Sequence, residues 1–186
     1  MKIGRAGAKA NRNLANTEIG FYKSGERQVA RYVSSTTVCE EGLERSRWVG
    51  LYWSASGQVQ RENIVAGLPG MSTLEFPLQA FDLEIDGQSL HTRWDVTASG
   101  SRAGARPGTR EAVLELRHQL RPFAVKVITR VDGTPFLARR LEITNLGKKP
   151  AALARVSPWS GLLWTWKRNE HWGEQPPVST GAFRLG

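Results

Sequence analysis

The chain is short of the residue types from which many binding and catalytic sites are built. It has one cysteine, Cys39, and three histidines among 186 residues. A single cysteine excludes an internal disulfide and a zinc site built from several cysteines. No two histidines have the spacing of metal ligands, and His118 falls on the apolar face of a predicted strand, as a hydrogen-bonded core histidine would. The sequence therefore predicts no metal site and no cofactor.

Motifs of several common enzyme classes are also missing. The stretch "GARPGT" lacks the lysine and the strand–helix context of a phosphate-binding loop, and no G-x-S-x-G nucleophile turn occurs. Only four residues are aspartate. Two of them, Asp82 and Asp86, lie in predicted strand and turn positions, where we expect structural roles. The sequence therefore names no catalytic residue of its own.

Long apolar runs are absent too, since none approaches the ~18 residues that cross a bilayer. The basic start "MKIGRAGAKANRN" is not followed by the apolar segment of a signal peptide. The hydrophobic fraction of 40% and the charged fraction of 23% are those of a globular protein. We therefore expect a cytoplasmic protein with no membrane partner.

Hydrophobic and polar residues alternate along much of the chain, which predicts β-strands. In "FDLEID", residues 81–86, apolar and acidic residues alternate before the turn signal Asp86-Gly87. "AVLELRHQL" and "FAVKVITRV" continue the alternation, the first with Leu114, Leu116 and Leu120 on one face. Further strands are predicted at 27–39, at 47–57, around Leu141 and after Leu153. Successive strands with short turns and no amphipathic helix predict an all-β antiparallel sandwich.

Two segments lack this alternation. Residues 1–25 carry no sustained apolar period, and we expect a loosely ordered lead-in there. The Gly-, Ser- and Arg-rich segment 99–109 predicts a long mobile loop. The predicted domain organisation is therefore a lead-in over residues 1–25 and one β-sandwich domain over residues 26–186.

Basic residues are abundant, and the formal net charge is +9. Residues 102–156 alone hold twelve basic and only four acidic residues. The period of two places four of these cations on the outward halves of strands, beside outward acids such as Glu142, which favours a solvated sheet face. A nucleic-acid-binding module is the weaker alternative, because no signature of such a module is present. The outward cations in question are Arg117, Lys126, Arg130 and Arg140.

Seven residues are tryptophan, and four of them lie in "SPWSGLLWTWKRNEHW", residues 157–172. Flat indole faces beside hydrogen-bonding groups suit a sugar ring, which has an apolar face and a rim of hydroxyls. An alternative remains for Trp164 and Trp166, because residues two apart on a strand share a face and would equally fill a core or an interface. The carbohydrate-contact candidates are Trp159, Trp164, Trp166, His171 and Trp172.

Two segments, "FDLEIDGQSLHTRWDV" and "LELRHQLRPFAVKVITRVDGTPFLARRLEITNLGKKPAALARVSPWSG", resemble the amino-terminal β-sandwich domain of glycoside hydrolase family 36. The similar elements are a strand ending in D-G-x-x-L, two long strands, a P-x-x-x-R-x-x-x-I-x-N strand and a return to L-x-R-V, within residues 75–166. That family contains retaining α-galactosidases. The resemblance implies an antiparallel β-supersandwich, similar to galactose mutarotase, that packs on a catalytic (β/α)₈ barrel. It also implies a galactoside-type carbohydrate ligand and a possible homo-oligomer.

The catalytic aspartates of that family lie on the barrel, which needs ~250 residues. Retaining hydrolysis needs two carboxylates ~5 Å apart, and no aspartate follows "LEITNLG". We therefore expect a non-catalytic accessory sandwich, truncated at its C-terminus. The alternatives are a carbohydrate-binding module or a free-standing sugar mutarotase or epimerase, which would need a histidine acid and a carboxylate base. The available residues for that chemistry are Glu115, His118, Glu170 and His171.

Overall fold

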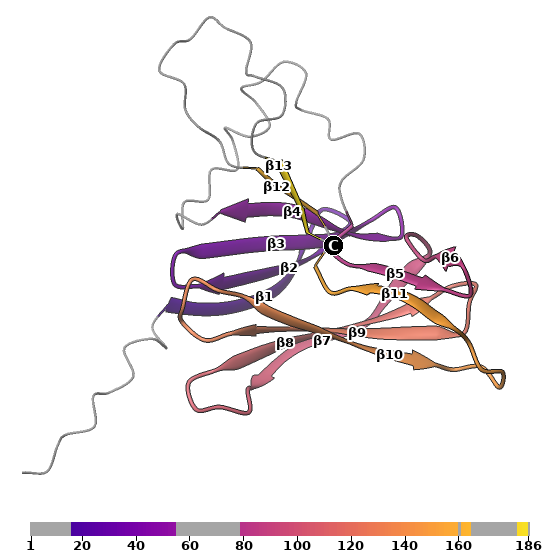
Figure 1. The fold of residues 1–186 in the computed structure, drawn as a ribbon. Coiled ribbons are helices and arrows are strands. Elements are labelled where there is room, and N and C mark those ends of the chain that lie inside the picture. The colour runs from indigo at the N-terminus through magenta and orange to yellow at the C-terminus, as the bar shows by residue number, and fades with distance from the viewer. Residues whose placement is uncertain (1–15, 55–78, 160, 165–181, 186) are drawn as a thin grey trace, which may run out of the picture.

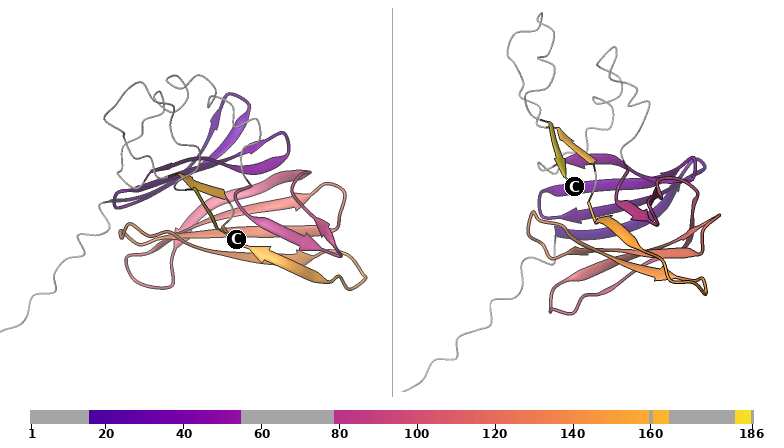
Figure 2. Two further views of the ribbon diagram at one scale, coloured as in Figure 1. Left: turned by 45° about the horizontal axis from the view of Figure 1, so that its top comes forward. Right: turned by 45° about the vertical axis from the view of Figure 1, so that its right-hand side comes forward.

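A computed structural model of the chain describes residues 16–54, 79–159, 161–164 and 182–185. This part of the chain forms thirteen strands, all paired antiparallel, and contains no α-helix (Figure 1). The all-β antiparallel fold expected from the alternation of hydrophobic residues is confirmed. Two four-stranded sheets lie one over the other and enclose the core, as the two turned views of Figure 2 show.

The first sheet is a meander in the order β1-β2-β3-β4. Its turns at 25–26, 35–36 and 45–46 use left-handed residues, among them Gly25, Ser35 and Ser46, as two-residue hairpin turns require. Two predictions are wrong here. The strand expected at 27–39 is two strands divided by the turn at 35–36, and residues expected in the lead-in form β1. The strands are β1 (Thr17–Ser24), β2 (Arg27–Ser34), β3 (Thr37–Glu44) and β4 (Arg47–Ser54).

The second sheet has the order β10-β9-β8-β7, and a smaller sheet, β11-β5-β6, lies beside it. The expected Asp86-Gly87 turn joins β5 to β6, with φ angles of 53° and 71°. The last two strands, β12 (Gly161–Trp164) and β13 (Ala182–Leu185), pair with each other. The remaining strands are β5 (Asp82–Ile85), β6 (Gln88–Ser89), β7 (Trp94–Ala103), β8 (Arg110–His118), β9 (Phe123–Val131), β10 (Ala138–Asn145) and β11 (Leu153–Ser157).

The prediction of a mobile loop at residues 99–109 is wrong for the first half of this segment. Residues 99–103 continue β7 and pair with β8 from Ser99↔Leu114 to Ala103↔Arg110. Only the short connection that follows is a turn, closed by the Gly104 N–H donating to Thr109 O at 2.9 Å. The edge strand is exposed along this stretch, so its residues carry no apolar signal, and backbone pairing alone defines it.

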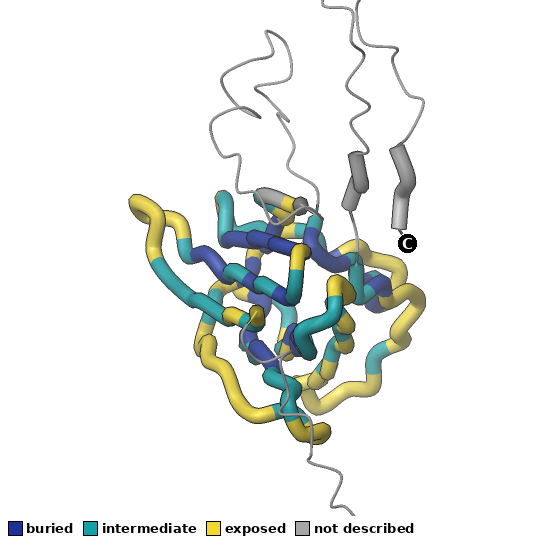
Figure 3. The backbone as a smooth tube through the Cα atoms, turned by 90° about the vertical axis from the view of Figure 1, so that its left-hand side faces the viewer, coloured by how far each residue is buried: buried dark blue, intermediate teal, exposed yellow. Residues whose placement is uncertain are grey.

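The core lies between the two sheets (Figure 3). Tyr32 and Trp48 come from the first sheet, and Trp94, Leu116 and Val127 come from the second. All five are almost fully buried, as the alternation within their strands requires.

Leu120 departs from the predicted pattern, because it is 74% exposed. It lies beyond the end of β8, where the period of two no longer applies. Leu114 and Leu116, which were expected on the same face, are buried in the core.

His118 is the buried core histidine that the sequence predicted. Its Nδ1 accepts hydrogen bonds from the N–H groups of Leu120 and Arg121 at 3.2 and 3.0 Å. Its ring meets the Trp94 indole edge to face, with centroids 5.0 Å apart. Burial, and then the charge of Arg121, lower the pKa of His118. The imidazole is therefore held neutral, with Nδ1 as an acceptor.

This lowered pKa predicts a pH dependence of stability. Because the folded pKa lies below that of the unfolded chain, ~6.5, the unfolded state binds the proton more readily. The contribution of His118 to the free energy of unfolding is fully present above about pH 6.5. It is lost as the pH falls from there toward the pKa of the folded state. Urea unfolding at a series of pH values should show this decrease in the wild type and not in His118→Gln.

Glu111 provides an internal comparison. Hydrogen bonds, led by the one from Arg140, lower its pKa from 4.5, so its contribution is lost only at lower pH, below the window of His118. A His118→Gln variant that keeps the full decrease below about pH 6.5 would contradict the assignment.

Candidate functional site

The candidate site lies where the two sheets and the segment after β11 meet. Trp53 comes from β4, and Trp159 follows the end of β11 by two residues. Beneath Trp159 lies Arg139 of β10, which pairs with Glu41 of β3. We call Trp53 and Trp159 the tryptophan platform, and Arg139 with Glu41 the buried ion pair.

The buried ion pair joins the two sheets directly. Arg139 Nη1 lies 2.7 Å from Glu41 Oε1, and Nη2 donates to Oε2 at 2.8 Å. The side chains are 0% and 2% exposed. Two further donors of Arg139 are used, since Nε donates to Thr129 Oγ1 at 3.0 Å and Nη1 donates to Ala80 O at 3.2 Å. A bidentate pair with all these partners is the geometry in which a buried charge is tolerated.

Glu41 has further partners from the first sheet. Its Oε2 accepts hydrogen bonds from Trp48 Nε1 at 3.0 Å and from the Tyr32 hydroxyl at 3.4 Å. Burial, and then the charge of Glu41, raise the pKa of Tyr32 well above its usual value, so the phenol stays protonated. Burial is the largest single influence on Arg139 and lowers its pKa, but the charge and hydrogen bonds of Glu41, together with Tyr32 and Cys39, outweigh burial, so the pKa is raised. The guanidinium is therefore permanently charged.

Trp159 lies flat over this fixed charge. The Arg139 Cζ atom is 3.7 Å from the centroid of the Trp159 ring, a close cation–π contact. Trp53 meets Trp159 edge to face, with centroids 5.6 Å apart and an interplanar angle of 83°. The Trp53 residue is 42% exposed, and Trp159 is half-buried. The platform therefore presents indole surface to solvent on a support that cannot move freely.

The inward direction of Arg139 follows from the phase of β10. It alternates with Arg140 and shares a face with Leu141, and it stands opposite Thr129 in the register of β9. Alternation predicted an outward Arg140, which the structure confirms, but no inward role was predicted for Arg139. The alternation could have predicted that Arg139 points inward, because residue 139 is in phase with the apolar positions of its strand. The role of Trp53 was also missed.

The predicted carbohydrate candidates are only partly described by the structure. Trp159 lies in the platform, and Trp164 ends β12, where it pairs with Ala182. The other three, Trp166, His171 and Trp172, lie outside the described residues. The structure thus brings Trp159 together with Trp53, a residue outside the predicted set.

Glu115 and His118 of β8 do not form the acid–base pair that a mutarotase requires. Glu115 and His118 are three residues apart on this strand and therefore point to opposite faces. Glu115 forms an ion pair with Lys126 at 2.9 Å, and His118 is buried on the core side. The other two residues considered for this chemistry, Glu170 and His171, lie outside the described residues.

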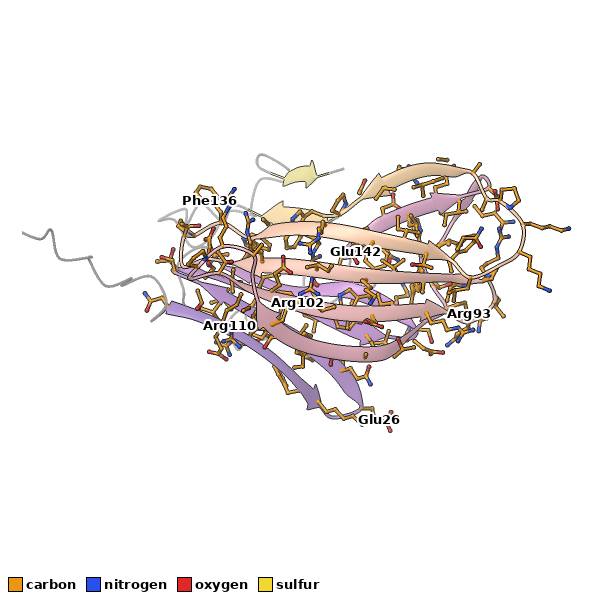
Figure 4. All side chains as sticks on the ribbon, turned by 90° about the horizontal axis from the view of Figure 1, so that it is seen from below. Glu26, Arg93, Arg102, Arg110, Phe136 and Glu142 are labelled. Carbon is orange, nitrogen blue, oxygen red and sulfur yellow. The ribbon has the colours of Figure 1, made fainter. Side chains whose placement is uncertain are left out.

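The outer face of the second sheet carries paired charges (Figure 4). Glu111 accepts hydrogen bonds from Arg102 at 2.9 Å and from Arg140 at 2.7 Å. Arg140 also approaches Glu142 at 3.5 Å. Arg102 and Arg140 thus lie among acidic side chains on this face, as expected for a solvated, charge-paired sheet face.

Within the described ranges, no group of three or more His, Cys, Asp or Glu residues is placed to hold a metal ion. No helix in those ranges is long and apolar enough to cross a membrane. The chain matches no known family model, no curated protein and no solved structure. The resemblance to glycoside hydrolase family 36 therefore rests on sequence motifs alone, and the tryptophan platform is the main structural guide to function.

The buried ion pair generates a prediction about stability. Removing one partner leaves the other charge buried and unpaired, so Arg139→Met and Glu41→Met should each lower the free energy of unfolding by about 3–5 kcal/mol. The double variant removes both charges and should lose clearly less than the sum of the two single losses. Urea unfolding of the four proteins measures this coupling.

The pair Arg27–Glu44 is a control of the same chemistry, an Arg–Glu pair at 2.7 Å, but it is exposed and joins neighbouring strands of one sheet. The same methionine substitutions there should change stability by only about 0–1 kcal/mol. Additive losses at Arg139 and Glu41 would show that the two charges do not depend on each other.

Proposed function

We propose that the chain is a non-catalytic accessory β-sandwich that binds carbohydrate at the tryptophan platform. The observation that carries this proposal is the placing of Trp159 on a buried guanidinium, with the 42% exposed Trp53 at its edge. A pyranose ring packs an apolar face on an indole and needs little movement of a preorganised surface. Tryptophans of this kind dominate the energy of many binding surfaces.

The class of sugar and the partner come from the sequence motifs. The D-G-x-x-L element falls on β5 and β6, the two long strands are β8 and β9, and the P-x-x-x-R-x-x-x-I-x-N element leads into β10. This order supports an accessory sandwich of an α-galactosidase-like hydrolase. The ligand would be a galactoside, and the partner would be a (β/α)₈ barrel, with self-association of the parent enzyme as a further expectation.

Arg139 occupies the arginine position of that motif. The structure attaches a physical role to this position, because the same side chain holds Glu41 and lies under Trp159. The proposed sugar surface and the motif therefore meet at one residue. This supports a link between the platform and the motif, without assigning a catalytic role to either.

The burial and partners of His118 and Glu115 on β8 favour a non-catalytic role over mutarotase activity. A neutral, buried His118 with Nδ1 accepting two backbone hydrogen bonds has no access to a sugar ring. Glu115 is on the opposite face and is neutralised by Lys126. The chain alone should therefore neither hydrolyse α-galactosides nor accelerate mutarotation of α-galactose. Release of p-nitrophenol from its α-galactoside and polarimetry measure the two rates, and strong turnover in either assay would contradict the proposal.

Binding is tested with methyl α-galactoside and the full chain, using isothermal titration calorimetry. Trp159→Ala and Trp53→Ala should each weaken binding at least tenfold, since truncating an aromatic hot-spot residue costs about 2 kcal/mol or more. Trp159→Ala should weaken binding more than Trp53→Ala, because the Arg139 guanidinium lies under the ring of Trp159.

Leu120→Ala is the matched control for a large exposed side chain. Leu120 is 74% exposed and follows β8, at the opposite end of β9 from the position of Arg139. This variant should bind as the wild type does. Absence of galactoside binding in the wild type, or unchanged affinity in both tryptophan variants, would overturn the carbohydrate proposal.

A further inference from the structure

A cavity of about 200 Å³ lies between the two sheets, away from the tryptophan platform. It opens where β1 and β7, the outermost strands of their sheets, run along the same side of the sandwich. Among the described strands, neither β1 nor β7 has a further neighbour in its sheet, so no pairing between described strands closes the gap between them. The lining includes Phe21, Gln28, Trp48, Val96, Ser99 and Leu114.

The size of the cavity matches one six-membered ring. An apolar cavity of ~150 Å³ in another protein is sufficient to bind benzene. Here Phe21 and Trp48 supply aromatic walls, and Leu114 supplies an aliphatic one. The Trp48 Nε1–H already donates to Glu41 at 3.0 Å, so its indole offers the cavity only apolar ring surface.

One polar atom in this lining is unsatisfied. Gln28 faces inward by its alternation with Ala30 and Tyr32 on β2, both fully buried. Its Oε1 atom is buried and accepts no hydrogen bond from any residue in the described part of the chain. A buried acceptor without a donor costs free energy, and a ligand that brings a donor removes this cost.

We propose that the cavity binds a small monocyclic phenol, whose ring packs between Phe21 and Trp48 and whose hydroxyl donates to Gln28 Oε1 once this buried amide turns toward the ring. A phenol has one donor for the one free acceptor. A pyranose would bury several hydroxyl groups against apolar walls such as Leu114 and Val96, at a cost in desolvation. The site is therefore separate in chemistry and in position from the carbohydrate platform, and it does not depend on the proposed function.

The test uses the full chain and two fluorinated probes observed by ¹⁹F NMR. 4-Fluorophenol carries the hydroxyl donor, and fluorobenzene has nearly the same ring without it. In the wild type, 4-fluorophenol should bind saturably and at least tenfold more tightly than fluorobenzene, because only the phenol satisfies Gln28. Gln28→Leu removes the acceptor and should abolish the difference, with fluorobenzene bound at least as well as in the wild type.

Two further variants separate the site from general effects on the fold. Ser99→Phe introduces a large side chain at an exposed position of the lining and should block both probes. Gln88→Leu changes an exposed glutamine on β6, outside the lining, and should leave both affinities unchanged.

The outcomes that overturn the proposal are distinct from those that overturn carbohydrate binding. No saturable shift with either probe would remove the ligand site altogether. A preference for 4-fluorophenol that persists in Gln28→Leu would remove the assigned hydrogen bond, as would equal affinity for the two probes in the wild type. Trp159→Ala should leave 4-fluorophenol binding unchanged, and displacement of the phenol by methyl α-galactoside would contradict a separate site.

Discussion

The architecture depends most on one ion pair, because Arg139 and Glu41 are charged groups that the two sheets enclose between them. A charge in such a place is stable only with its partner and its full set of hydrogen bonds. The partner of each is on the opposite sheet, and Thr129, Trp48 and the backbone of Ala80 complete the set. The pair therefore specifies how β3 and β10 lie against each other, in a way that apolar contacts, which have no fixed direction, do not.

The same pair also organises the surface above it. Trp159 lies over a guanidinium that stays charged and that is held in place by Glu41, Thr129 and the backbone of Ala80. Trp53 then meets Trp159 from another strand. The buried ion pair thus supports the proposed binding surface as well as the core. It holds Trp159 in place, and preorganisation of an aromatic side chain reduces the entropy lost on binding.

Away from this ion pair, the second sheet carries paired charges on its outer face. The outer face of the second sheet pairs Glu111 with Arg102 and Arg140, and Glu115 with Lys126, so these three cations have acidic partners although the chain carries a net charge of +9. On the inner face, His118 is kept neutral by burial. Gln28, which lines the cavity, buries an acceptor that has no donor among the described residues.

The sequence by itself determined the all-β fold, the Asp86-Gly87 turn, the core role of His118 and the outward charges of the second sheet, because alternation and turn chemistry are local properties. It did not reveal β1 or the second half of β7, whose residues are held by pairing rather than by apolar pattern. Arg139 was in phase with Leu141, but its partner Glu41 is distant in the chain. Only the tertiary structure brings them together with Trp159, since the energy of a buried charge depends on what surrounds it in space.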